Sequence, residues 1–229
     1  MGRRVRRDAC LISLALLAIC LSAMASSQGA IDVSVPLGQE PLLDGTISTE
    51  EWDDARAIEL NDRSTLYLKH ANDMLYIAVR ATTMGIPSPL ILREGDVHVL
   101  HASAALGSAV YHETDGVWGQ AKDFEWHCRL RGFSEMAVAE RAAFFAQEGW
   151  LGTIGYLGAR TEFEYKIRLD GSSLRMLFLF MEATRPAQVL SWPAEPEEAD
   201  HYLPLITGPI PLEISVDFGQ WAVLTLTTD

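Results

Sequence analysis

The tryptophans of this chain are its best candidates for ligand chemistry. A flat aromatic ring can stack on the C–H groups of a sugar ring while polar groups at its rim bind hydroxyls. Trp118 lies in a Gly-flanked turn within Asp115–Gln120, where burial is less natural, so we take it as a candidate solvent-facing platform. Trp126 is a second candidate, although core packing is the more common role at a strand end. The other four are expected to pack in the core or anchor a loop: Trp52, Trp150, Trp192 and Trp221.

Three histidines lie close together in the sequence and raise the question of a metal site. His98, His101 and His112 fall within fifteen residues. Zinc needs three or four ligands that converge on one point. On a strand, however, positions 98 and 101 face opposite sides. The pattern therefore favours ordinary surface or half-buried histidines, and we predict no metal site.

Sequence signatures of enzymes are absent from the chain. It contains no G-x-S-x-G, no H-E-x-x-H, no P-loop and no G-x-G-x-x-G. The many carboxylates could be paired in any number of ways, so their abundance indicates no acid–base pair. We predict a non-catalytic binding protein with no cofactor, while an unrecognised activity stays open.

Alternating strands must position these side chains. Ser64–His70 alternates, Asn72 and Asp73 form a turn, and Leu75–Ala81 returns with its own alternation, which predicts a hairpin. A second hairpin is predicted from Phe163–Leu169 through the Asp170-Gly171-Ser172 turn into Leu174–Met181. The return strand is apolar on both faces, which is typical of a strand inside a sandwich. The last strand is expected at Trp221–Thr227.

One helix interrupts the strands. Ser134 can cap its start, Glu135 suits its first turn, and Gly149 can end it. Val138, Ala142 and Phe145 share a face at helical spacing, so we expect this face to pack on the sandwich. The fold class predicted is all-β: a two-sheet antiparallel β-sandwich, jelly-roll-like, with one inserted α-helix. A single domain is expected over residues 26–229.

The order of several motifs resembles family 9 carbohydrate-binding modules and their relatives with a DOMON-like sandwich. An Asp44-Gly45 turn precedes Trp52 and the first hairpin, and an acidic residue opens the strand Gly95–Leu100. Glu164–Leu169 looks like the family's glutamate-bearing strand, and Phe218–Leu226 resembles its closing strand. The resemblance implies a ligand-binding sandwich rather than an enzyme.

The chain departs from this family where the sugar is held. The family grips a terminal sugar between two tryptophans, but the neighbourhood of the first, Leu90–Glu94, has no aromatic residue here. In the loop of the second, the only aromatic residue after Trp192 is Tyr202. The resemblance thus implies Tyr202 as a third ligand-binding candidate beside Trp118 and Trp126, and weak carbohydrate binding as the function.

Two alternatives stay open. Haem-binding relatives of this sandwich use His, Met or Lys as axial ligands, and such residues occur in the run Lys69-His70 and at Met74 and Met84. A haem- or small-hydrophobe-binding DOMON-like protein is therefore the first alternative. The second is a structural or interaction module that uses its faces for protein contacts.

The first 25 residues read as a signal peptide. Four arginines, Arg3 to Arg7, precede the apolar run Ala9–Ser22, and Ala23-Met24-Ala25 is a small-x-small cleavage signal. The run is shorter than the roughly 20 residues of a membrane span, so no stable span is expected after cleavage. A lipoprotein at Cys20 is disfavoured because bulky Ile19 precedes it. We expect a secreted or periplasmic protein of bacterial type.

Net charge and cysteine content limit the classes of binding partner and the disulfide bonds that we expect. The net charge is −13 and becomes more negative without the basic signal segment, which excludes nucleic acid and suits a neutral small molecule or glycan. Cys10 and Cys20 leave with the signal, so Cys128 is the single cysteine of the mature chain and no internal disulfide forms. An inert buried thiol is the expected role of Cys128. The pattern indicates no oligomeric state.

Overall fold

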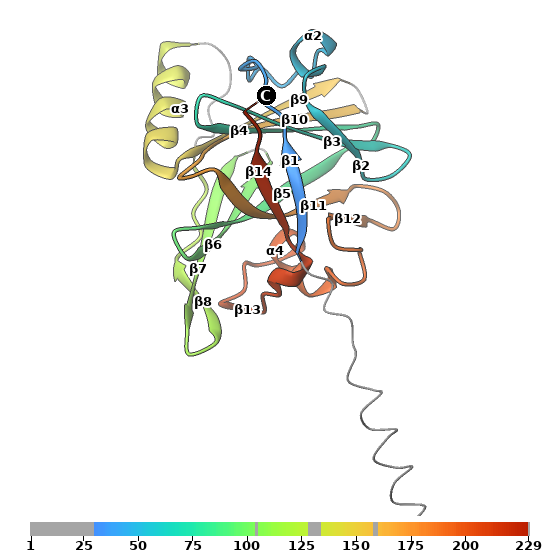
Figure 1. Ribbon diagram of the computed structural model, residues 1–229. Coiled ribbons are helices and arrows are strands. Elements are labelled where there is room, and N and C mark those ends of the chain that lie inside the picture. The colour runs from blue at the N-terminus through green and yellow to red at the C-terminus, as the bar shows by residue number, and fades with distance from the viewer. Residues whose placement is uncertain (1–29, 104, 128–133, 158–159, 229) are drawn as a thin grey trace, which may run out of the picture.

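Two facing β-sheets make up most of the molecule (Figure 1). The computed structural model describes residues 30–103, 105–127, 134–157 and 160–228. Among these, the larger sheet runs in the order β1 (Ile31–Val35), β14 (Ala222–Leu226), β11 (Ser173–Glu182), β5 (Gly85–Arg93), β6 (Asp96–Ala102), β7 (Leu106–Thr114), β8 (Val117–Lys122) and β13 (Glu213–Ile214), with β12 (Gln188–Trp192) also paired to β11.

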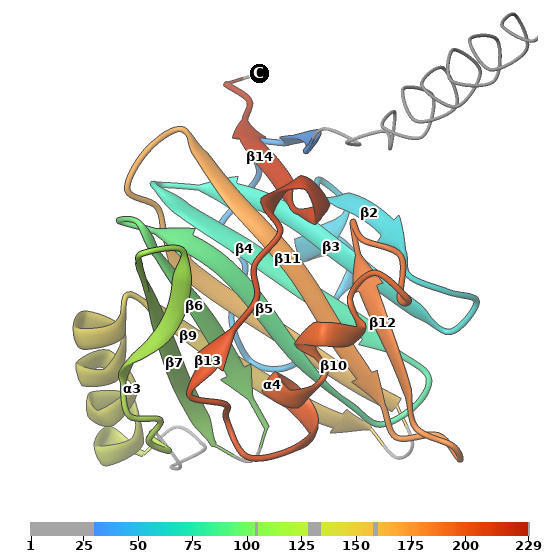
Figure 2. The same cartoon turned by 90° about the horizontal axis from the view of Figure 1, so that it is seen from below.

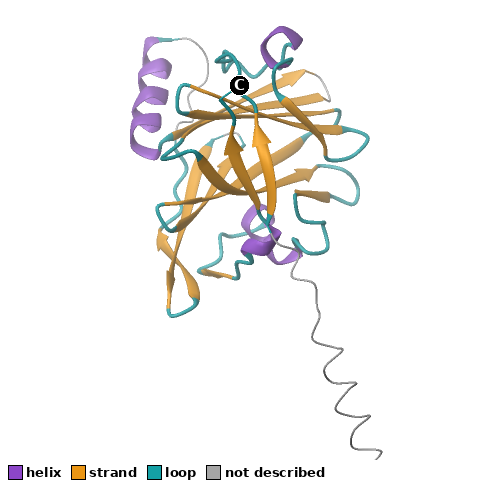
Figure 3. Ribbon diagram, in the orientation of Figure 1, coloured by secondary structure: helices purple, strands orange, loops and turns teal. Residues whose placement is uncertain are grey.

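The smaller sheet lies across the larger one, and helices are few (Figure 3). Its order is β2 (Arg56–Glu59), β3 (Ser64–Ala71), β4 (Met74–Ala81), β10 (Arg160–Arg168) and β9 (Trp150–Leu157). The described helices are α2 (Thr49–Trp52), α3 (Glu135–Glu148), α4 (Pro204–Thr207) and the short 3-10 turns η1 (Asp200–Tyr202) and η2 (Phe218–Gln220). The predicted β-sandwich is confirmed. Its pairings are antiparallel except for the parallel pair of β1 with β14.

The first predicted hairpin is present, whereas the second is not. β3 and β4 pair antiparallel across Asn72 and Asp73, both with positive φ. β10 and β11 occupy their predicted places in the chain but belong to different sheets: β10 pairs with β4 and β9, and β11 with β5, β12 and β14. The Asp170–Ser172 turn carries the chain between layers. Alternation predicts which strands form but not which partner each strand finds.

Side chains of β10 and β11 build the core between the sheets. Phe163, Tyr165 and Ile167 of β10 pack in one cluster with Phe178 and Phe180 of β11. The opposite residues of β11 are buried as well, on the outer face of the larger sheet. β11 therefore has apolar neighbours on both sides, as its sequence predicts.

The outer face of the larger sheet is covered by the segment of residues 193–221. Figure 2 shows α4 and β13 lying across the strands of this face. Leu177 and Leu179 of β11 form one buried cluster with Tyr202 and Trp221 from the covering segment. The Trp221 indole N–H donates to the Tyr202 hydroxyl at 3.1 Å, so the covering segment is tied down by a buried polar contact.

The outer face of the smaller sheet is covered by the segment of residues 43–55. Trp52 is buried there, as predicted, and donates its indole N–H to the Glu164 carboxylate at 3.1 Å. The same carboxylate accepts from the Gly45 backbone N–H at 2.7 Å. Gly45 has φ +86°, and a Cβ there would lie 2.7 Å from the backbone of Ile154 and Gly155, so this close approach requires glycine.

Helix α3 begins and ends where the sequence predicts, but a different face packs. The Ser134 hydroxyl accepts from the Ala137 N–H, and Gly149 ends the helix in the left-handed region with φ +70°. Val138 is 49% exposed, whereas Ala137 and Phe144 are buried. Phe144 packs edge-on against Trp150 of the adjoining β9, with ring centroids 5.3 Å apart. Of the predicted face, Val138 and Ala142 are exposed, and Phe145 is half-buried beside Arg168 of β10.

Candidate ligand-binding site

Two of the three aromatic residues singled out in the sequence, Trp118 and Tyr202, are buried in one cluster beneath the cover of the larger sheet. Trp118 is 7% exposed and packs edge-on against Phe218, with ring centroids 5.7 Å apart. Tyr202 is fully buried, and its hydroxyl accepts from the Asp217 backbone N–H as well as from Trp221. Neither ring offers the open face that stacking on a sugar requires, which corrects the expectation of a solvent-facing platform at Trp118.

Pairing of β8 with the distant strand β13 explains the burial of Trp118. The hairpin turn is formed by Asp115 and Gly116, both with positive φ, and Trp118 already lies two residues along β8. There it is paired with Ile214 of β13, which belongs to the segment covering the larger sheet. A glycine-rich turn indicates where the chain reverses. It does not show that a distant segment will fold over the neighbouring strand.

Trp126 has the exposed aromatic surface that the other two lack. It is 42% exposed, the highest exposure among the tryptophans of the described chain. Its ring stands edge-on to Phe124, with centroids 4.8 Å apart, and edge-on to His101, at 5.0 Å. The two contacts hold the indole in position while part of its surface stays open. We call Phe124, Trp126 and His101 the Trp126 platform.

The platform rests on the end of the β6–β7 hairpin. Leu106 and His127 exchange two backbone hydrogen bonds, at 3.1 and 2.7 Å, which fix the segment that carries Phe124 and Trp126. A Cβ at Gly107 would lie 2.5 Å from the Phe124 ring, so glycine there makes room for that ring. The residues beneath Trp126 are therefore shaped to support it.

His101 supports the platform and is uncharged at neutral pH. Its side chain is buried on β6, and its Nδ1 lies 3.2 Å from the hydroxyl of buried Ser88. Burial lowers the pKa of His101 to about 4, so the imidazole is uncharged at neutral pH. Of the residues next to Trp126 in the chain, His127 faces α3, with its ring centroid 6.1 Å from that of Phe144, and the Glu125 carboxylate lies 3.5 Å from His127 Nε2. An uncharged aromatic surface suits the stacking of a sugar ring.

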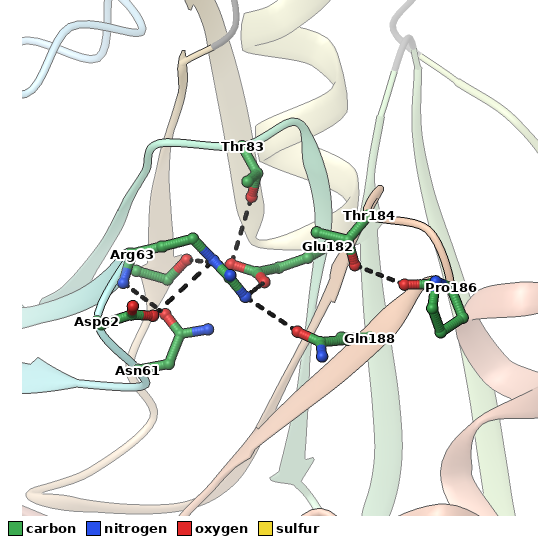
Figure 4. A network of polar contacts seen from close by, with 9 residues as sticks. Asn61, Asp62, Arg63, Thr83, Glu182, Thr184, Pro186 and Gln188 are labelled. Atoms are coloured by element: carbon green, nitrogen blue, oxygen red, sulfur yellow. Dashed lines mark hydrogen bonds and ion pairs between the residues drawn. The ribbon is translucent and has the colours of Figure 1, made fainter.

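A second polar feature joins the two sheets at one end of the sandwich (Figure 4). Glu182, at the end of β11, is fully buried, and its carboxylate accepts from Ser64 at 2.7 Å, Arg63 at 2.9 Å and Thr83 at 3.3 Å. The same Arg63 nitrogen donates to Gln188 of β12 at 2.9 Å. We call the set the Glu182 cluster: Asn61, Arg63, Ser64, Thr83, Glu182 and Gln188.

Hydrogen bonds keep the Glu182 carboxylate charged in its buried position. Burial acts to raise the pKa of this carboxyl, but hydrogen bonds from Ser64, Arg63 and Asn61 outweigh it and hold the pKa below its ordinary value. The Arg63 side chain remains 37% exposed. The cluster thus presents an arginine whose position is set from beneath by a buried carboxylate.

Residues considered for metal or haem have other partners. Within the described ranges no group of three or more His, Cys, Asp or Glu side chains could hold a metal ion, and His112 pairs with Asp96 at 2.6 Å. Lys69 is buried, forms an ion pair with Asp54 at 2.9 Å and donates to the Glu51 carbonyl. His70 Nε2 lies 2.7 Å from the Thr227 carbonyl. Cys128 lies outside the described residues.

Some of these groups could have been found from the sequence. Phe124 and Trp126 are two aromatic residues in alternate positions of a polar stretch, and that spacing is a usable signal for a shared surface. Glu182 directly follows the apolar run Met176–Met181 of β11, and a carboxylate buried at that strand end needs a polar partner. The partner itself, Arg63, is more than a hundred residues away in the sequence and has no such signal.

The fold is that of a two-sheet β-sandwich protein. No family model matches the sequence, and no curated protein matches it. Among solved structures, the chain is similar to a family 9 carbohydrate-binding module from Caldicellulosiruptor kristjanssonii, solved in complex with cellotriose. The sequence identity is 9%, the match covers 86% of this chain and 94% of that chain, and the TM-score is 0.47. No helix in the described part of this chain is long and apolar enough to cross a membrane.

Proposed function

We propose that this chain is a non-catalytic binding module that binds a neutral glycan at the Trp126 platform. The observation that carries the proposal is the exposed indole of Trp126, held edge-on by Phe124 and His101. Large aromatic surface in water is costly, and fixing it with two further rings gives a rigid stacking face for an apolar sugar face.

Charge supports a neutral ligand rather than an anionic one. The chain carries a net charge of −13, and Glu125 precedes Trp126 in the sequence. Anionic sugars and nucleic acid would approach against this field. One stacking face rather than two also limits affinity, which we expect in the high micromolar range or weaker, on the order of −5 kcal/mol or less in magnitude.

Replacing Trp126 with alanine is expected to weaken glycan binding by roughly fivefold or more, because an aromatic contact of about 1 kcal/mol or more is lost. Trp126→Phe should retain part of the affinity because it keeps a smaller stacking face. The measurement is calorimetry against a panel of neutral glycans. Val117→Ala, at another exposed apolar residue on the β7–β8 hairpin, is the matched control and should bind as the wild type does.

Unchanged affinity in the Trp126→Ala variant would exclude the platform as the binding site. If the wild type binds no neutral glycan at millimolar concentration, glycan binding itself is excluded. A protein that purifies red would instead indicate haem, and a colourless protein without glycan affinity would favour the interaction module.

We also propose that the module works outside the cytoplasm, as a secreted or periplasmic protein. The basic segment and the Ala23-Met24-Ala25 motif support this, and both lie outside the described residues. Expression with the full leader should yield a mature chain that begins after Ala25. N-terminal sequencing of the exported protein checks the site, and a recovered chain that still carries Arg3 would contradict it.

A further inference from the structure

The Glu182 cluster lies on the face of the larger sheet that meets the smaller sheet. On β11, Glu182 shares this face with Phe180, which packs in the core between the two sheets. Leu179 points the other way, and its partner Ser88 contacts the Trp126 platform through His101. The cluster and the platform are therefore on opposite faces of the larger sheet, and one sugar ring cannot contact both.

The guanidinium of Arg63 is fixed in this cluster and still has donors to spare (Figure 4). Its Nη2 atom donates to the Glu182 carboxylate and to the Gln188 amide oxygen, each at 2.9 Å, and these two bonds set the plane of the group. Within the described chain, Nε is the one Arg63 nitrogen that is buried without an acceptor. The side chain is 37% exposed. Arg63 thus presents the two N–H groups of Nη1 to solvent in a fixed direction.

A second donor and an acceptor lie beside Arg63. Gln188 is exposed, and because its amide oxygen accepts from Arg63, its Nε2 group is left as a donor. Asp62 is 85% exposed, and its Oδ1 atom lies 3.9 Å from Arg63 Nε. The surface of the cluster therefore combines N–H donors from two side chains with one carboxylate acceptor.

Donors next to an acceptor match hydroxyl groups better than they match a carboxylate. A hydroxyl both accepts and donates, so neighbouring hydroxyls of a sugar can accept from Arg63 or Gln188 and donate to Asp62. A carboxylate can only accept. It would also lie near Asp62, while the charge of Glu182 balances that of Arg63. The arrangement favours a neutral polyhydroxy ligand over an anion.

We propose that the Glu182 cluster is a second binding site, separate from the Trp126 platform, which takes neighbouring hydroxyls of a neutral sugar on Arg63, Gln188 and Asp62. The platform would hold a sugar by stacking, and this site would hold one by hydrogen bonds. Two sites on opposite faces of one sheet allow a single chain to bind two glycan segments at once, which raises avidity for a multivalent glycan. The second site does not depend on the platform and would remain if the platform bound nothing.

Titration with methyl β-D-glucopyranoside, followed by nuclear magnetic resonance, tests the second site. The side-chain N–H signals of Arg63 and Gln188 report on it directly, and both should shift in the wild type and, to the same extent, in Trp126→Ala. Asp62→Asn and Gln188→Ala each weaken one hydrogen-bonding group and should lower the affinity read from the Arg63 signal by roughly fivefold. Gln147→Ala, at an exposed glutamine of α3, is the matched control and should leave that affinity unchanged.

Glucuronate separates recognition of hydroxyls from recognition of a carboxylate. Asp62→Asn should strengthen glucuronate binding while it weakens binding of the methyl glucoside, and because Asp62 is exposed the change leaves the fold intact. Glucuronate that binds the wild type as tightly as the glucoside, or more tightly, would show an anion site and overturn the assignment to sugar hydroxyls.

Two other results would overturn the second site itself. If the shifts at Arg63 and Gln188 disappear in Trp126→Ala, the cluster only responds to sugar bound at the platform. If neither signal shifts in the wild type at millimolar glucoside, the cluster binds no sugar, whatever the platform binds. Shifts that persist in Trp126→Ala, together with an unaffected Gln147→Ala, would support the second site even where the platform fails its own test.

Discussion

Trp52→Ala is expected to lower the free energy of unfolding by about 3–5 kcal/mol, the usual range for truncating a buried aromatic side chain. Trp52 is the largest side chain in the cover of the smaller sheet, where it packs with Ile47, Tyr76 and Ala78. Its loss would leave a cavity between the covering segment and the strands beneath.

The substitution also removes a polar contact. The Trp52 N–H is one of the donors that satisfy the buried Glu164 carboxylate, and its ring lies 4.9 Å from the Lys69 ammonium. A buried acceptor that loses its donor costs about 1–3 kcal/mol, and we count this within the 3–5 kcal/mol expected for Trp52→Ala. The indole therefore contributes both packing and a hydrogen bond to the turn at Gly45.

Urea titration of three variants separates these contributions. Trp52→Phe keeps most of the packing and loses only the N–H, so it should cost about 1–3 kcal/mol. Trp126→Ala, which truncates the same residue type at a position that is 42% exposed, should cost less than Trp52→Ala because less apolar surface loses its burial. A Trp52→Ala protein that melts with the wild type would show that the residue does not anchor the cover.

The parts of the fold that follow from local patterns were predictable. Asn72 and Asp73 favour a left-handed turn, and strands on both sides of them alternate, so the β3–β4 hairpin follows from adjacent residues. Trp52 could be placed in the core from the Asp44-Gly45 turn before it. The structure supplies the physical reason for the glutamate of β10, since Glu164 holds both the turn and the tryptophan.

The parts that depend on contacts between distant segments were not predictable. Trp118 and Tyr202 are buried because residues 193–221 fold across the larger sheet, and no pattern around either residue indicates that cover. The predicted face of α3 was wrong for a related reason. Phe144 and Phe145 are adjacent; Phe144 packs on Trp150 in the core, whereas Phe145 is half-buried beside Arg168 of β10.

In the candidate site, too, residue types could be predicted from local sequence, whereas contacts between distant segments could not. Trp126 was recognised as an aromatic candidate from its type and position, but its support comes from His101 and Phe124, whose rings meet only in the folded chain. In the Glu182 cluster, Arg63 and Gln188 come from different sheets. A surface assembled from several strand ends cannot be read from any one of them.

Ionisation of Glu164 is expected to destabilise the protein as the pH rises towards neutrality. Burial raises the pKa of this carboxyl from its ordinary value of 4.5 to about 7, and the hydrogen bonds from Gly45 and Trp52 offset burial only in part. Below pH 4.5 the group is protonated in both the folded and the unfolded chain. Between the two values only the folded chain holds the proton, so stability falls with rising pH, and above about 7 the loss is complete.

The shift of about 2.5 pKa units corresponds to about 3 kcal/mol. His101 acts in the opposite direction, because burial lowers its pKa from 6.5 to about 4 and makes the folded state gain stability as the pH rises between those values. The pH profile of the wild type alone therefore mixes the two effects. Comparison with a variant that lacks one group separates them.

Glu164→Gln removes the titrating carboxyl and leaves every other ionisable group in place. By urea titration, the stability advantage of the wild type over this variant should be about 3 kcal/mol larger at pH about 4.5 than at pH about 8. His101→Gln is the control of opposite sign. The free energy of unfolding of the wild type relative to that variant should increase as the pH rises from about 4 to about 6.5. Parallel pH profiles for the wild type and Glu164→Gln would mean that Glu164 stays ionised throughout, held by its hydrogen bonds to Gly45 and Trp52 in spite of its burial.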